Sequence, residues 1–238
     1  MKDRLRIVMC RPTRAGNVGA AARAMKTMGM SSLVLVDPLH PAGDQDAIAR
    51  ARDGRDVLAA ARTVATVAEA VADCVWVVGL SGRARALGPP ACDVREAARV
   101  SLERALEGPV AWVVGTERDG LSNAELSACH ALARIPTDDA LLSLNLGAAV
   151  QLACYELHCA ATTGSPAPPD APTASATRGE VQALVDRLHR ALVAVGPFAE
   201  GDAKLRAVEQ RALRLLDRAG PGPEELRAIH AMLKWLGH

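Results

Sequence analysis

Residues 5–29, LRIVMCRPTRAGNVGAAARAMKTMG, join a short apolar run to a segment of small residues. The run 5–9 is almost entirely apolar, as expected of a strand that is buried on both faces of a sheet. The segment 18–28 is rich in alanine and has helical spacing, and Asn17 just before it is a good N-cap. The stretch therefore predicts a β-strand followed by an α-helix.

The same alternation continues along the chain. Further apolar runs occupy residues 33–36, 75–78, 110–114 and 132–135, and residues 44–61 and 93–105 have helical spacing. This order predicts an α/β fold, a parallel sheet with helices on both faces. The 238 residues, 50% of them apolar, suffice for one core of about 150 residues and a small second unit.

A change of composition separates the two units. Residues 162–177, TTGSPAPPDAPTASAT, can bury little apolar surface and are typical of a flexible linker. Beyond it, residues 179–195, 202–218 and 223–236 have apolar residues at helical spacing between glycine and proline breakers. We therefore expect a main α/β domain over 1–161, a linker over 162–177 and a small all-α unit over 178–238.

The positive charge is concentrated at the start of the chain. The formal net charge is only +1, but residues 1–30 carry seven basic residues against one acid, which gives +6. Such a field attracts phosphate groups, whereas the alternative is a solvated basic face that has no partner. The basic residues are Lys2, Arg4, Arg6, Arg11, Arg14, Arg23 and Lys26.

Cysteine usage and hydropathy indicate a soluble, cytoplasmic protein. The six cysteines lie scattered through apolar segments without a C-x-x-C pair, as in a reduced compartment. Cys154 and His158 could share one helical face, but no second ligand pair accompanies them, so we expect no metal. No apolar run reaches the length of about 18 residues that spans a bilayer, so we expect no membrane contact.

Polar loops follow the predicted strands where ligands bind in open α/β sheets. Residues 79–90 and 115–123 come directly after apolar runs, and neither contains a dinucleotide fingerprint or a P-loop. In the segment 11–29, the small residues leave Arg23 projecting from a nearly bare helix, which a substrate or another backbone could approach closely. An ordinary helix that packs through its alanine face, with a solvated Arg23, is the alternative. In the segment 135–157, either Ser143 or Asn145 could simply cap the following helix.

Three of these segments together resemble a known family. NVGAAARAMKTMG (17–29), GTERDGLSNAEL (115–126) and IPTDDALLSLNLGAAVQLACYEL (135–157) are similar, in order and spacing, to the three motifs of the SpoU family of SPOUT RNA methyltransferases. The helical C-terminal unit is similar to that of the TrmJ-type tRNA 2'-O-methyltransferases within it. The resemblance implies a trefoil knot near the end of the catalytic domain and a homodimer.

The resemblance also implies a cofactor and a site. S-adenosylmethionine is expected in the loops after the strands, held largely through backbone groups. The implied catalytic residues are Asn17, Arg23, Glu117, Ser143 and Asn145. The implied cofactor-binding residues are Gly79, Leu80, Ser81, Gly82, Gly115, Thr116, Ile135, Leu142, Ser143, Leu144 and Asn145.

Arg23 is the residue most expected to serve catalysis. A guanidinium is nearly always protonated and is therefore a poor base, so orientation of the RNA and stabilisation of charge suit it better than proton removal. For Glu117 the alternatives are a carboxylate that binds backbone amides, a partner of Arg23, or an ordinary salt bridge within the loop.

The implied reaction is methylation of an RNA ribose 2'-hydroxyl, with a pyrimidine at position 32 of the tRNA anticodon loop as the family's typical target. Two departures are present: TDDALL stands where a more polar stretch with tyrosine is expected, and GLSGRAR replaces Gly-Thr-Ser-Ala-Arg. The first bears on substrate choice. Ribosomal RNA as the substrate, or a non-catalytic RNA-binding module, are the alternatives.

Overall fold

The computed structural model describes residues 2–82, 88–138, 144–163, 175–195 and 198–235. Within these ranges, seven parallel strands form one sheet in the order β3-β2-β1-β6-β4-β7-β5. The parallel α/β fold predicted from the alternation is thus confirmed. The strands are β1 (Leu5–Cys10), β2 (Ser32–Val36), β3 (Arg62–Val64), β4 (Trp76–Leu80), β5 (Ala91–Asp93), β6 (Val110–Val114) and β7 (Ala131–Arg134).

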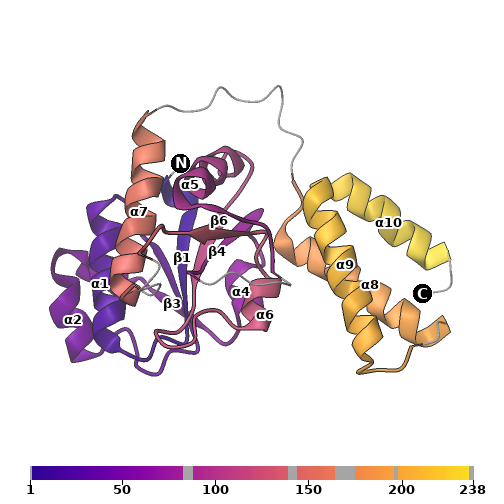
Figure 1. Cartoon of the computed structure of the whole chain (residues 1–238), viewed down its shortest axis with the longest axis horizontal. Helices are drawn as coiled ribbons and strands as arrows, with labels where there is room; N and C mark the ends of the chain where they lie inside the picture. The colour runs from indigo at the N-terminus through magenta and orange to yellow at the C-terminus, as the bar shows by residue number, and fades with distance from the viewer. Residues whose placement is uncertain (1, 83–87, 139–143, 164–174, 196–197, 236–238) are drawn as a thin grey trace.

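Helices cover both faces of this sheet (Figure 1). Leu5, Ile7 and Met9 of β1 face a core that they share with α1, α5 and α7. Val8 and Cys10 face a second core, which contains residues of α4 and α6. The helices are α1 (Ala15–Thr27), α2 (Gln45–Ala51), α3 (Arg55–Ala59), α4 (Val67–Val71), α5 (Val94–Arg104), α6 (Asn123–Ser127), α7 (Leu146–Thr163), α8 (Arg178–Val195), α9 (Ala203–Ala219) and α10 (Pro223–Trp235), with 3-10 turns η1 (Lys2–Arg4) and η2 (Arg52–Gly54).

Three sequence predictions need correction. Asn17 is not the N-cap of α1, because the helix already begins at Ala15 and Arg14 holds the cap position. The helix predicted over 44–61 is broken, since α2 ends at Ala51 and Arg52 takes a backbone conformation with φ 46°. The linker predicted over 162–177 overlaps α7, which continues to Thr163, and residues 164–174 lie outside the described residues.

Small residues let α1 pack tightly between α2 and α7. A Cβ atom at Gly19 would lie 2.1 Å from the Ala47 carbonyl oxygen, and one at Gly54 would lie 2.6 Å from that of Ala22. On the other side, a Cβ at Gly147 would lie 2.9 Å from the Ala20 Cβ. The bare helix predicted from the sequence therefore receives neighbouring backbones at close range.

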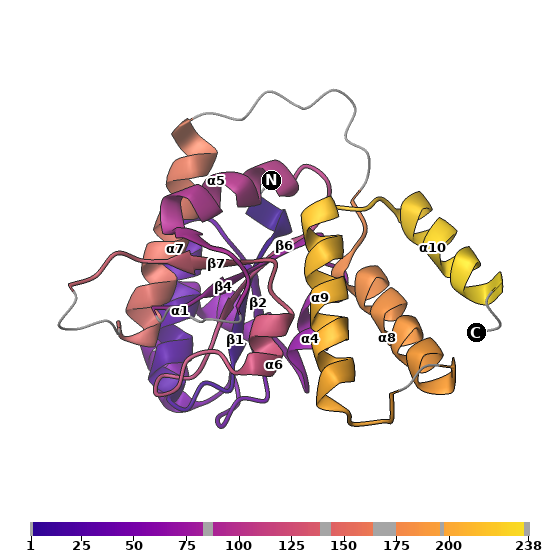
Figure 2. The same cartoon turned by 45° about the vertical axis from the view of Figure 1, so that its right-hand side comes forward.

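The helices α8, α9 and α10 build a separate small core that includes Leu184, Leu213 and Leu226. They lie on the α4 and α6 side of the sheet, away from α1 and α2 (Figure 1 and Figure 2). Arg178, only 3% exposed, joins the two parts. Its guanidinium pairs with Asp217 at 2.6 Å and donates to the Ser127 carbonyl, while its backbone N–H donates to the Cys74 carbonyl at 2.8 Å.

Candidate active site

Three loops leave the sheet side by side. In the register of the central strands, Leu80 of β4 pairs with Val114 of β6 and with Ala133 of β7. The ladder continues one step further, because the Ser81 N–H donates to the Ala133 carbonyl at 3.1 Å. The chain segments that begin at Ser81, Gly115 and Ile135 are therefore brought to one edge. Of the residues predicted to bind the cofactor, Gly79, Leu80, Ser81, Gly82, Gly115, Thr116 and Ile135 lie here, Leu144 and Asn145 lie just before α7, and Leu142 and Ser143 fall outside the described residues.

The loop after β6 is a tight turn that presents Glu117. Thr116 and Gly120 exchange two backbone hydrogen bonds, of 3.1 and 3.0 Å. Gly120 has φ 68°, and a Cβ at Gly115 would lie 2.0 Å from the Gly120 carbonyl carbon. Only glycine fits at position 115, and glycine suits the positive φ at position 120.

Glu117 holds the entry to α1. One carboxylate oxygen accepts from the Thr13 backbone N–H at 3.0 Å and from its hydroxyl at 2.8 Å. The other accepts from the Arg14 N–H at 3.2 Å and from the Asn17 amide at 2.9 Å. A carboxylate at a helix N-terminus also faces the positive end of the helix dipole. Among the alternatives for Glu117, binding of backbone amides is thus the one observed.

Burial acts to raise the pKa of Glu117, but the hydrogen bonds from Asn17 and Thr13 outweigh it. The pKa therefore lies below its ordinary value. The carboxylate remains charged at neutral pH and serves as an acceptor rather than as an acid.

Asn17 and Asn145 extend this network to α7. Asn17 is 7% exposed, and its side-chain Oδ1 accepts from the side-chain Nδ2 of Asn145 at 3.1 Å. Asn145 also caps α7, since its side-chain oxygen accepts from the Ala148 N–H at 3.3 Å. Asn17, Glu117 and Asn145 thus form a hydrogen-bonded cluster that joins α1, the loop after β6 and α7.

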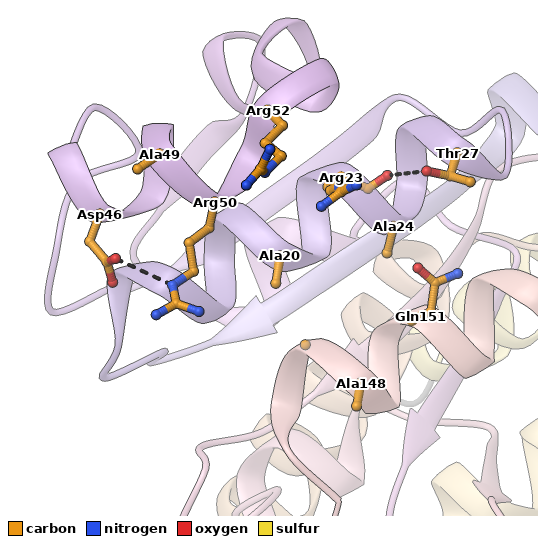
Figure 3. Close-up of a pocket in the computed structure, with 11 residues that line it drawn as sticks. Ala20, Arg23, Ala24, Thr27, Asp46, Ala49, Arg50, Arg52, Ala148 and Gln151 are labelled. Atoms are coloured by element: carbon orange, nitrogen blue, oxygen red, sulfur yellow. Dashed lines mark hydrogen bonds and ion pairs between the residues drawn. The ribbon is translucent and has the colours of Figure 1, made fainter.

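Arg23 lies apart from that cluster, in a cavity of about 830 Å³ between α1, α2 and α7. Its guanidinium is exposed and makes no hydrogen bond or ion pair with a described residue. Figure 3 shows it beside Arg52 and across from Gln151 of α7. The cavity is lined by Ala20, Arg23, Ala24, Thr27, Asp46, Ala49, Arg50, Arg52, Gly147, Ala148 and Gln151.

Most of the seven basic residues in 1–30 form ion pairs or hydrogen bonds within the protein. Arg6 pairs with Asp73, Arg11 with Glu125 and Lys26 with Asp56. Lys2 and Arg4 donate to backbone carbonyls. Only Arg14 and Arg23 of the seven have side chains without such a partner among the described residues. Fewer of these basic side chains are therefore free to bind a phosphate than the count of charges implies.

Sequence reasoning missed two parts of the site. Thr13 gives Glu117 two hydrogen bonds, and no sequence signal marks it. Ser122 and Glu125 form a capping box at the start of α6, and Glu125 also pairs with Arg11 at 2.9 Å. The S-x-x-E spacing of residues 122–125 is the signal that could have revealed this box.

Comparison with known proteins decides the family. The model of the SpoU rRNA Methylase family matches residues 4–155. The chain belongs to this SpoU family. A relative named tRNA (cytidine/uridine/adenosine-2'-O-)-methyltransferase TrmJ, from Pseudomonas aeruginosa, is 39% identical and is matched over 98% of this chain and 93% of its own length. A tRNA (cytidine/uridine-2'-O-)-methyltransferase TrmJ from Sodalis glossinidius is 36% identical and is matched over 100% of this chain and 93% of its own length.

Solved structures extend the likeness to the C-terminal helices. The crystal structure of TrmJ from Z. mobilis superposes with a TM-score of 0.85 at 29% identity and covers 98% of this chain and 99% of its own. A probable methyltransferase from Bordetella pertussis is 44% identical over 67% of this chain and 96% of its own, with a TM-score of 0.63. This SpoU-family chain has no helix among its described residues that is long and apolar enough to cross a membrane, and no cluster there of three or more metal-ligating side chains.

Proposed function

We propose that this chain transfers a methyl group from S-adenosylmethionine to the ribose 2'-hydroxyl of a pyrimidine nucleotide in tRNA. The observation that carries the proposal is the match, over essentially the whole chain, to relatives named as tRNA 2'-O-methyltransferases. The C-terminal helices, which the family model does not include, are part of that match. A tRNA substrate is also consistent with a cytoplasmic location.

The chemical groups at the sheet edge suit the binding of S-adenosylmethionine. Gly82 is exposed there, Ser81 and Thr116 are half-buried, and the apolar side chain of Leu144 is 39% exposed. Backbone donors and acceptors beside an apolar surface are what an adenine ring needs. When bound, the cofactor supplies an electrophilic methyl group, so the chain must chiefly align the acceptor oxygen. The residues proposed to hold it are 79–82, Gly115, Thr116, Ile135 and 142–145.

Arg23 is proposed to act on the RNA. Its unpaired guanidinium can bind the phosphate beside the target ribose and stabilise negative charge that develops on the 2'-oxygen. Asn17, Glu117 and Asn145 have their polar atoms engaged with one another and with the backbone. We therefore assign them a positioning role, which fixes α1, and with it Arg23, relative to the loops at the sheet edge.

A homodimer is proposed from the surface of α7. Leu152 is 38% exposed and Tyr155 is 48% exposed, and their spacing of three residues places them on one helical face. We propose that a second copy of the chain covers this face of α7. Sedimentation of the native chain as a monomer at micromolar concentration would contradict this assignment.

The substrate is tested by incubating purified protein and labelled S-adenosylmethionine with unmodified tRNA or with ribosomal RNA. We expect label in tRNA alone, at position 32 of the anticodon loop. A solved structure of a protein described as methylating C/U34 on tRNA is 25% identical over 66% of this chain, so position 34 is the next candidate. Label only in ribosomal RNA would overturn the tRNA assignment, and no label in either would favour a non-catalytic RNA-binding module.

A further inference from the structure

The cavity around Arg23 carries more positive charge than one catalytic arginine explains. Three guanidinium groups line it, those of Arg23, Arg50 and Arg52, against one carboxylate, that of Asp46. The remaining lining residues are uncharged, and most are alanine or glycine. These small side chains fill little of the cavity, so a bulky ligand can reach the charged groups.

The arginines of the cavity retain free hydrogen-bond donors. Arg50 is held by Asp46 through a single contact of 3.3 Å from its Nε. Its two terminal amino groups form no hydrogen bond with a described residue, and the side chain of Arg52 forms none at all. The Asp46–Arg50 pair rests against the start of α1, where a Cβ at Gly16 would lie 2.5 Å from the Asp46 carboxylate. Arg50 is thus oriented while its forked end stays available.

Arg52 has a backbone conformation that is unfavourable for a residue with a side chain. Its φ of 46° and ψ of −113° are those of the first central residue of a type II′ turn, a position dominated by glycine. The turn itself is required, because η2 must bring Gly54 against the backbone of α1. A glycine would make this turn without strain, yet the chain has an arginine whose side chain lines the cavity beside Arg23 (Figure 3). Strain of this kind is concentrated at functional sites.

The chemistry of the lining selects the ligand class. Forked guanidinium donors match the oxygens of phosphate groups. No aromatic side chain lines the cavity among the described residues, so bases have no stacking surface there. The cavity is therefore suited to a phosphodiester backbone rather than to a base.

We propose that Arg52, with Arg50, binds a backbone phosphate of the substrate RNA adjacent to the phosphate that Arg23 contacts. This inference rests on the proposed function and adds a second anchor point for the RNA strand. Because phosphate contacts position a nucleic acid without reading its sequence, Arg52 contributes affinity for all substrate tRNAs alike.

The test compares three full-length variants, Arg52→Gly, Arg52→Lys and Arg55→Ala, in their binding of unmodified tRNA at several salt concentrations. Arg55 is exposed, lies three residues further along and does not line the cavity, so its replacement controls for net charge. For Arg52→Gly we expect Kd to rise about ten-fold and the slope of log K against log salt to fall by about one. We also expect its melting temperature to rise, because glycine relieves the turn.

Arg52→Lys should bind with an intermediate Kd, and Arg55→Ala should bind like the native chain. Equal effects of Arg52→Gly and Arg55→Ala, or an unchanged Kd in Arg52→Gly, would overturn the inference while the native chain still methylates tRNA. A change of oligomeric state in Arg52→Gly would overturn it as well, since Arg52 would then belong to a subunit interface. A native chain that binds no RNA would instead remove the proposed function itself.

Discussion

Individual residues of the site divide into two groups with different tasks. Asn17, Glu117 and Asn145 satisfy one another through hydrogen bonds of 2.9 and 3.1 Å, whereas Arg23 is exposed and has no partner among the described residues. A side chain whose polar atoms are all engaged holds structure in place, and a free guanidinium can meet a ligand. The first group should therefore affect stability, and Arg23 should affect the reaction.

Arg23→Ala should lower the rate of methyl transfer at least about a hundred-fold, because a donor that stabilises charge in the transition state is lost. Its affinity for S-adenosylmethionine, measured by titration calorimetry, should be nearly unchanged. Arg23→Lys keeps the charge but not the fork, and should retain an intermediate rate. Loss of cofactor binding in Arg23→Ala would contradict placement of this residue on the RNA side.

Glu117→Gln should lower the free energy of unfolding at pH 7 by about 1–2 kcal/mol, since an amide group would face donors that now meet a carboxylate. The pKa of Glu117 is depressed in the folded chain, so its contribution is present above the ordinary pKa of about 4.3 and is lost as pH falls through the folded value. Urea unfolding should thus show a difference between native and variant at pH 7 that shrinks below about pH 4.

The matched control for that experiment is Glu224→Gln, because the Glu224 side chain is 92% exposed. It should leave the urea midpoint unchanged at both pH values. A stability difference for Glu117→Gln that stays constant across this pH range would show that the charge of Glu117 is not what holds α1.

The motifs predicted which residues matter but not how they are connected. Glu117 and Asn17 are one hundred residues apart in the chain, and their contact depends on β6 lying next to β1. Thr13 was missed for the same reason. Asn17 was placed at an N-cap because its residue type favours that position, but a carboxylate from another loop meets the backbone there instead.

At the scale of elements, the packing of α1 against α2 fixes the wall of the cavity. The two helices approach so closely that Gly19 has no room for a side chain. Since α1 carries Arg23 and α2 carries Arg50, their separation sets the distance between the charged groups.

Gly19→Ala should destabilise the protein by about 1–3 kcal/mol, although alanine is the better helix former, because the new Cβ would lie 2.1 Å from the Ala47 carbonyl oxygen. The control is Gly43→Ala, since a Cβ at Gly43 meets nothing within 4 Å. Thermal unfolding of both variants checks the prediction. A melting temperature for Gly19→Ala equal to or above the native value would contradict the close approach of the two helices.

Elements with a long apolar pattern could be predicted, and short ones could not. The strand over 110–114 was predicted with its observed bounds, and the helix over 93–105 within one residue of them. The edge strands β3 and β5 have three residues each, and α4 and α6 have five, which is too few to show a period. The break of the helix predicted over 44–61 was missed because an arginine, not a glycine, makes the turn.

At the scale of the whole molecule, a buried guanidinium attaches the C-terminal helices to the sheet domain. Arg178 pairs with Asp217 of α9 and binds the end of α6, and Gly179 donates its N–H to the Ala72 carbonyl at 2.9 Å. This attachment sets where the helical unit stands relative to the site. The three helices were predicted from their spacing, but their docking face was not, because it depends on contacts across the fold.

Arg178→Ala should lower the free energy of unfolding by about 3 kcal/mol, because it leaves the largely buried Asp217 carboxylate without its partner. Arg99→Ala is the control, since its pairs with Glu96 and Glu103 are exposed to solvent and should contribute little to stability. Equal midpoints for both variants in urea would show that the helical unit is held by other contacts.

The strand order, in which β6 lies between β1 and β4, could not be predicted either, since the neighbouring strands from β1 to β5 in this sheet are not consecutive in the sequence. The trefoil knot and the homodimer remain predictions from the resemblance. Family membership, in contrast, was predicted from three ordered motifs and is confirmed by the match over residues 4–155.

The most direct test of the proposed reaction is nucleoside mass spectrometry of tRNA after incubation with the purified protein and S-adenosylmethionine that carries a deuterated methyl group. The proposed function predicts 2'-O-methylcytidine or 2'-O-methyluridine with the intact label, formed at least about a hundred-fold more slowly with Arg23→Ala. Label on a base, or tRNA without label in the presence of the native protein, would contradict it.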